Sequence, residues 1–248
     1  MDRQCGEIMD TAFFQPNTDF SFLGIQHVLV VLFFLFAGMV LIRYARGRDK
    51  PTQNRLFFYL AWLVSSSIIV WTLLKWWIGP FDIKEDLPLH LCNFLALILP
   101  VFAIYRRFWM YEILVFWILA GTTQAILTPD LSEGFPHVNF FKYWLEHAGL
   151  VVFIIYATLI YDMRPTVKSI FKSFGAIQIY FIAMIVVNAF LGSNYLFISR
   201  KPDHASLLDA FGDWPYYILA EELIMVPYFY VIYLLLKRSS RVRSKELA

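Results

Sequence analysis

The chain has 248 residues, of which 59% are hydrophobic, 19% aromatic and only 16% charged, and its formal net charge is +2. The mean hydropathy of +0.59 excludes an ordinary soluble globular protein and indicates an integral membrane protein. The net charge says little, because the charges are confined to loops and tails, and no nucleic-acid partner is expected.

Seven segments are apolar enough to be membrane-spanning helices, which need about 20 residues each. They cover residues 23–44, 56–78, 88–105, 110–127, 141–161, 170–191 and 214–236. The third and fourth segments are short, so a tilted or re-entrant form stays open for them. The expected fold is an all-α, polytopic membrane helix bundle of seven transmembrane helices, forming one domain over residues 23–236.

The charges between these segments alternate along the chain. Basic residues gather at 43–55, 106–107, 164–172 and 237–245, whereas the N-terminal tail and the loop at 82–86 are acidic. By the positive-inside rule, this pattern places the N-terminus outside and the C-terminus in the cytoplasm. Residues 1–22 would then form an extracytoplasmic tail and residues 237–248 a basic cytoplasmic tail. Only Arg200 and Lys201 break the pattern.

Polar residues lie inside several segments, close to their outer ends. They are His90, Cys92 and Asn93 in the third segment, Gln124 in the fourth, His147 in the fifth, Asn188 in the sixth and Glu221 in the seventh. The inner halves carry almost no such residues. Because hydrocarbon penalises unsatisfied polar groups, we expect an outward-facing polar cavity. Singly, such residues are more commonly core or interhelical hydrogen-bond partners.

The two cysteines, Cys5 and Cys92, lie in very different surroundings, and a disulfide between them is not expected. The sequence has no Cys/His spacing typical of a metal site, and neither a metal nor a cofactor is expected. A thiol and an imidazole in one pocket are instead the minimum for nucleophilic acyl transfer.

Cys92 is the candidate nucleophile. His147, on a different helix, is the better base, because His90 follows the same helix as Cys92 and points largely away. Glu146 is expected to point elsewhere, so an orienting carboxylate would be Glu221 or Glu222. The side chains that could donate hydrogen bonds to an acyl oxyanion are Asn93, Gln124 and His90.

Several short motifs carry a family resemblance. They are His90-Leu-Cys-Asn93, Gly121-Thr-Thr-Gln124 with Thr128-Pro-Asp130, Glu146-His147, Asn194-Tyr-Leu-Phe197 and Trp214-Pro-Tyr-Tyr217. Together they resemble the bacterial YwaF-like integral membrane proteins. That family is similar to the transmembrane protein 164 acyltransferases and, more distantly, to the androgen-induced lipid hydrolases.

The resemblance implies Cys92 as nucleophile and His147 as base. It implies acyl transfer or hydrolysis on a lipid ester, with membrane lipids such as a phospholipid or lysophospholipid as substrate. It also implies a multi-pass protein of the bacterial plasma membrane, with Asn194 among the supporting residues.

Two other functions remain open. A transporter or small-ligand receptor could bind a solute in the same cavity, with His90, His147 and Glu221 binding or relaying protons; flux or binding would then survive Cys92→Ser. An inverted repeat or broken helices would favour it, and the sequence shows neither. A scaffolding protein would use the polar residues only to hold helices together, so Cys92→Ala would change stability alone.

Overall fold

The computed structural model describes residues 19–79, 81–202 and 207–237, and helices form nearly all of its regular structure. In order, the elements are α2 (Ile25–Arg46), α3 (Lys50–Ile78), α4 (Leu91–Tyr105), α5 (Phe108–Trp117), the π-helical turn η1 (Ile118–Thr122), α6 (Thr123–Leu127), α7 (Val138–Ile160), α8 (Val167–Leu191), the short 3-10 helices η2 (Tyr195–Phe197) and η3 (Leu207–Phe211), and α9 (Tyr216–Leu236). One isolated antiparallel bridge joins Asp19 to Glu133.

Six stretches are long and apolar enough to cross a membrane. They are Ile25–Arg46, Lys50–Trp77, Phe108–Leu127, Val138–Ile160, Val167–Leu191 and Tyr216–Leu236. Leu91–Tyr105 is also apolar but shorter. The all-helical, multi-pass membrane fold predicted from the sequence is therefore confirmed. The seventh crossing and the orientation of the termini stay predictions, and most of the two expected tails lies outside the described residues.

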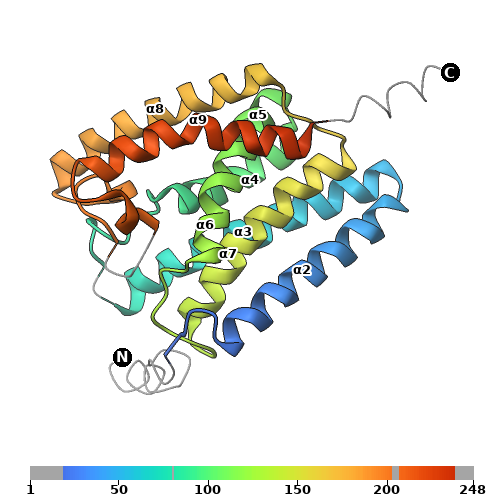
Figure 1. The fold of residues 1–248 in the computed structure, drawn as a ribbon. Helices are drawn as coiled ribbons and strands as arrows, with labels where there is room; N and C mark the ends of the chain where they lie inside the picture. The colour runs from blue at the N-terminus through green and yellow to red at the C-terminus, as the bar shows by residue number, and fades with distance from the viewer. Residues whose placement is uncertain (1–18, 80, 203–206, 238–248) are drawn as a thin grey trace, which may run out of the picture.

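Helix α7 occupies the middle of the bundle and packs against α2, α3, α4 and η1 (Figure 1). The core beside it is aromatic: the ring of Phe57 stacks on that of Phe153 at 4.1 Å, and Phe102 meets Phe57 edge-on at 5.8 Å. Helices α8 and α9 lie together along one edge of the bundle, and α2 lies along the opposite edge. The candidate residues on α4 and α7 are thereby held in the interior.

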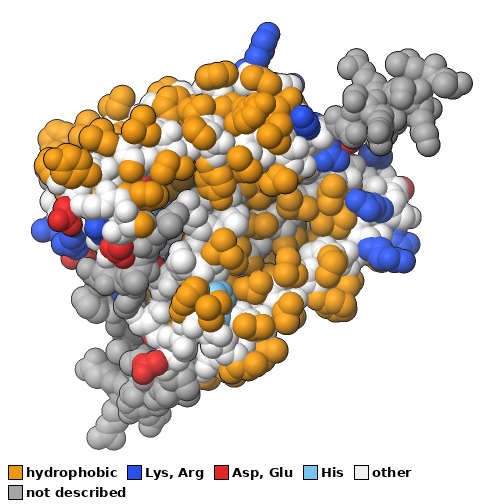
Figure 2. All heavy atoms as spheres, viewed as in Figure 1, with side chains coloured by type: hydrophobic (Ala, Val, Ile, Leu, Met, Phe, Trp, Pro, Cys, Tyr) orange, Lys and Arg blue, Asp and Glu red, His pale blue; other side chains and the backbone are white. Residues whose placement is uncertain are grey.

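Hydrophobic side chains also cover much of the outer surface. Figure 2 shows them over α2 and over the pair α8 and α9, while Lys and Arg gather near the end of the molecule where α2 and α9 finish. Phe190 and Leu223, for example, are 86% and 78% exposed. Such a surface suits contact with lipid rather than water.

One buried carboxylate lies near the opposite ends of the helices, where the sequence predicts almost no polar residues. Glu112, in the first half of α5, is buried and accepts a hydrogen bond from Ser169 Oγ at 2.7 Å. It also pairs with the Lys172 ammonium. Thr166 and Ser169 form a capping box that begins α8 at this point. A buried carboxylate needs such partners, so this group fixes α8 to α5.

Candidate functional site

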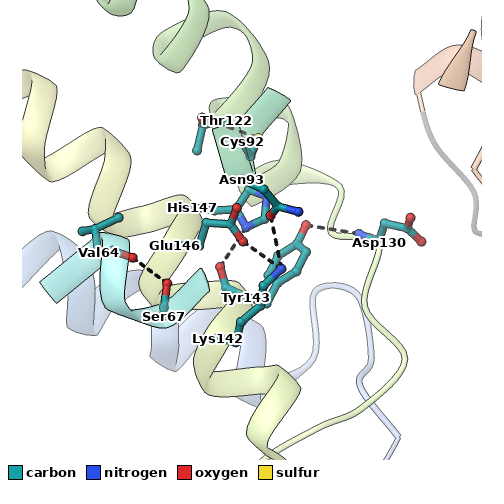
Figure 3. Close-up of polar contacts among 10 residues, drawn as sticks. All are labelled: Val64, Ser67, Cys92, Asn93, Thr122, Asp130, Lys142, Tyr143, Glu146 and His147. Carbon is teal, nitrogen blue, oxygen red and sulfur yellow. Dashed lines mark hydrogen bonds and ion pairs between the residues drawn. The ribbon is translucent and has the colours of Figure 1, made fainter. Parts of the chain in front are cut away.

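The thiol of Cys92 lies in the first turn of α4, directly after the extended N-cap residue His90. The side chain is half-buried, and its Sγ is 3.9 Å from Thr122 Oγ1. Thr122 is fully buried and ends η1. Single π-helical turns inside α-helices occur frequently at functional sites. Here the turn lies within the continuous helical stretch Phe108–Leu127, at the point where that stretch meets Cys92 (Figure 3).

The imidazole of His147 is buried on α7 and has a defined tautomer. Its Nδ1 lies 2.8 Å from the backbone oxygen of Tyr143. Because a carbonyl oxygen can only accept, Nδ1 carries the proton, and Nε2 of the neutral ring is left with its lone pair. The ring also stacks on the Tyr143 phenol at 4.1 Å between centroids. The ring nitrogen of His147 that is free to accept a proton is therefore Nε2.

Tyr143 is itself fixed by the chain that follows α6. Its hydroxyl donates to the backbone oxygen of Ala125 at 2.8 Å and accepts from the backbone nitrogen of Asp130 at 3.2 Å. Tyr143, whose ring and carbonyl hold His147, thus lies against the end of the helical stretch that carries Thr122.

A buried ion pair lies on α7 beside these groups. Lys142 Nζ is 2.9 Å from Glu146 Oε2, and the two side chains are 15% and 0% exposed. The Asn93 amide contacts both: Lys142 Nζ is 3.5 Å from its oxygen position, and exchanging the amide oxygen and nitrogen lets Asn93 donate to Glu146 at 2.5 and 3.2 Å. The residue after Cys92 is thus tied to α7, and the expectation that Glu146 points away from the site is wrong.

Cys92 and His147 lie in one polar group, and each has a different hydrogen-bond partner. Figure 3 shows Cys92 and Thr122 next to the group formed by Asn93, Tyr143, Glu146 and His147. Across the described part of the chain, no hydrogen bond joins the thiol to the imidazole; their partners are Thr122 and the Tyr143 carbonyl. Catalytic hydrogen bonds in unliganded enzymes are often longer than in the complex with substrate.

Two of the predicted supporting residues organise the loop after α8 instead of contacting the thiol. Asn188 accepts from Ser193 Oγ and from the backbone nitrogen of Tyr195, and donates to the Tyr195 oxygen at 2.9 Å. Asn194 accepts from Ser199 N and Arg200 N and donates to the Arg200 oxygen. Both amides are therefore committed to backbone partners.

The loop that these amides organise covers His90. The imidazole of His90 lies 5.3 Å from the Tyr195 ring and 5.0 Å from the Phe197 ring. Leu196 and Phe197 both have positive φ values, 62° and 54°, a conformation that non-glycine residues adopt at a cost. His90 thus supports the start of α4 through packing.

The acidic residues of α9 lie apart from this group. Glu222 accepts a hydrogen bond from Gln178 of α8 at 2.7 Å, and Glu221 is half-buried beside it. The expected orienting carboxylate is replaced by the backbone oxygen of Tyr143. Gln124 is half-buried in α6, where its backbone oxygen accepts from Thr128. No three His, Cys, Asp or Glu side chains in the described ranges are grouped as a metal site.

Sequence reasoning missed Thr122, Lys142, Tyr143 and Glu146 as parts of this group. The spacing of Lys142 and Glu146 was a usable signal, because residues four apart share a helix face and oppositely charged pairs there attract. Thr122 gave no such signal, since its approach to Cys92 depends on the π-helical turn. Tyr143 contributes through a backbone oxygen, which every residue has.

Comparison with known families and proteins identifies relatives of this chain. The model of the TMEM164 family matches residues 22–233, which include Cys92, Thr122 and His147. An uncharacterized protein of Treponema pallidum (strain Nichols) is 26% identical over 119 residues, which are 48% of this chain and 50% of that protein. The match thus spans about half the length of this relative. No solved structure matches the chain. Because the family match extends over most of the sequence, the chain belongs to the TMEM164 family.

Proposed function

We propose that this protein transfers or hydrolyses the acyl group of a lipid ester inside the membrane, with Cys92 as nucleophile and His147 as base. The observation that carries the proposal is the tautomer of His147. Its Nδ1–H donates a hydrogen bond to the Tyr143 oxygen. The unprotonated Nε2 is therefore left as the basic nitrogen in the polar group that contains Cys92. The earlier resemblance to lipid acyltransferases of the transmembrane protein 164 family agrees with this role.

In the proposed reaction, His147 Nε2 takes the proton of the thiol while the sulfur attacks the ester carbonyl carbon. The ester C–O bond then breaks, and the leaving alcohol or lysolipid takes the proton back from His147. The resulting Cys92 thioester is attacked by a lipid hydroxyl in transfer or by water in hydrolysis, which releases the thiol. Thr122 Oγ1 is the proposed hydrogen-bond donor to the negative charge that develops at this site.

A lipid substrate follows from the position of the group within an apolar bundle. Cys92 lies at the start of a hydrophobic helix, and His147 lies about 13 Å from the start of α7 at 1.5 Å per residue. An ester group at this depth keeps its acyl chains in hydrocarbon. We propose a phospholipid or lysophospholipid of the bacterial plasma membrane, an outward-facing site and no cofactor.

The test measures acyl transfer between phospholipids, and release of free fatty acid, by the full chain in lipid nanodiscs. Cys92→Ala should abolish both reactions, and His147→Ala should lower them by roughly 10²–10⁴-fold, the usual contribution of a general base. Cys5→Ala is the matched control and should retain activity. A Cys92→Ala variant as active as the wild type would sink the mechanism. Solute binding or flux that survives Cys92→Ser, without any acyl turnover, would favour transport instead.

A further inference from the structure

A hydrophobic groove lies between α2 and α7, on the side of α7 next to His147. The groove has a volume of about 180 Å³, and all of its lining side chains are apolar. It extends on α2 from Val31 to Ile42 and on α7 from Trp144 to Ile155. On α7 the lining positions 144, 148, 151, 152 and 155 follow the helical repeat, so they form one continuous face of the helix.

The dimensions of the groove suit a single hydrocarbon chain. Eleven residues of helix correspond to about 17 Å at 1.5 Å per residue, which is close to half of the roughly 30 Å hydrocarbon core of a bilayer. The whole lining is apolar, as a chain of methylene groups requires. The groove therefore suits one acyl chain of one leaflet.

The end of the groove that Trp144, Ala148 and Ile126 form is the end next to the candidate site. Trp144 and Ala148, which line it, are the α7 residues three before and one after His147. Ile126 closes the same end, and the backbone oxygen of the preceding Ala125 binds the Tyr143 hydroxyl. Along the axis of α7, this end of the groove therefore lies within about one helical turn of His147.

We propose that this groove binds one acyl chain of the lipid on which the protein acts. The identity of the chain as part of the substrate rests on the proposed function, whereas its binding does not. Gly38 of α2 contributes to the fit, because a Cβ at this position would come within 3.0 Å of Val152 Cγ2. A side chain there would press on the wall of the groove.

The test uses a phospholipid that carries a photoactivatable diazirine in its acyl chain, in nanodiscs with the full-length protein. Crosslinked peptides from α2 and α7 should exceed those from the lipid-facing α8. Val151→Trp should lower the crosslinking of the lipid to α2 and α7 at least about fivefold. Met39→Trp, at a 62% exposed lining position that does not support the core, should do the same. Val186→Trp, at a 48% exposed position on α8, is the matched control and should change nothing.

The outcomes separate the two proposals. Crosslinking should persist in Cys92→Ala; if it persists while that variant keeps full acyl transfer, the catalytic mechanism fails and the groove stands. If α2 and α7 were labelled no more than α8, and neither tryptophan variant changed this labelling, the label would report only contact with bulk lipid. That result would overturn the proposal that the groove binds an acyl chain. A dimer of the wild type in the nanodiscs, found with a protein–protein crosslinker and lost on Met39→Trp, would assign the groove to a dimer and also overturn it.

Discussion

At the residue scale, the contact between Cys92 and Thr122 is open to direct test. Thr122→Val removes the hydroxyl but keeps the shape of the side chain, so a thiolate at Cys92 loses its donor. Because a hydrogen bond to a charged group contributes about 1.5–3 kcal/mol, alkylation of Cys92 by iodoacetamide should slow at least about tenfold. Acyl transfer should fall with it.

The controls for this change use the other buried hydroxyls. Thr122→Ser keeps the donor and should restore most of the alkylation rate. Thr158→Val removes a buried hydroxyl that lies 3.0 Å from the Tyr111 hydroxyl. Thr158 is eleven residues beyond His147 on α7, so this variant should leave that rate unchanged. An alkylation rate unaffected by Thr122→Val would show that the 3.9 Å contact has no effect on the thiol.

The pair Lys142 and Glu146 makes a prediction about stability. With 15% and 0% exposure, each charge depends on the other, so removing one leaves a buried charge unpaired. Lys142→Met and Glu146→Leu should each lower the free energy of unfolding by about 3–5 kcal/mol, measured by denaturation in detergent. The double variant should lose clearly less than the sum. Asp162→Asn, at the exposed pair with Arg164, should cost at most about 1 kcal/mol; equal losses at both pairs would contradict the argument.

At the scale of elements, the packing of α3 on α7 depends on Gly149. A Cβ at this position would lie 2.5 Å from Val64 Cγ2, closer than two such atoms can approach, so Gly149→Ala forces the helices apart. Overpacking of this kind costs about 1–3 kcal/mol. We expect a lower melting temperature for Gly149→Ala and its recovery in the double variant Gly149→Ala/Val64→Ala.

Gly175 of α8 provides the matched control, because nothing lies within 4 Å of a Cβ built there. Gly175→Ala should raise stability slightly, since alanine is favoured over glycine in a helix interior by about 1 kcal/mol. A Gly149→Ala variant that gained stability as Gly175→Ala does would contradict the close approach of α3 and α7.

The elements themselves were largely predictable, and their differences from the prediction have physical causes. Hydropathy located each long helix, but it reports immersion in hydrocarbon and not helical conformation. Helix α3 therefore begins at Lys50 with Pro51 in its first turn, six residues before the apolar segment begins at residue 56. The π-helical turn Ile118–Thr122 was beyond prediction, because its residues are as apolar as those of an α-helix.

The positions of the candidate residues along their helices were predictable from the sequence, but the directions in which their side chains face were not. Matching positions along the helices predicted that Cys92, Asn93 and His147 lie close together, and Figure 3 draws them in one group. The same reasoning also suggested Asn188, which organises the loop after α8, and Glu221, which lies on α9 apart from this group. Which way a side chain faces depends on how each helix is rotated against its neighbours, and a membrane depth contains no information about that rotation.

At the scale of the whole molecule, the number of crossings depends on α4. Its 15 residues span about 22 Å at 1.5 Å per residue, short of the roughly 30 Å core. If α4 crosses, the chain has seven spans and its termini lie on opposite sides. If α4 only enters and returns, six spans remain and the termini share one side.

The charge pattern favours crossing, because Arg106 and Arg107 follow α4 directly whereas Asp82, Glu85 and Asp86 precede it. Reporters inserted at the exposed Lys84 and after Arg107 should therefore lie on opposite sides: alkaline phosphatase active only at Lys84, and green fluorescent protein fluorescent only after Arg107. Arg107→Glu with Arg106→Glu should weaken this asymmetry, whereas Arg200→Glu, in the outer loop, should not. If the same reporter were active at both sites, α4 would instead be re-entrant, with Cys92 on its descending half.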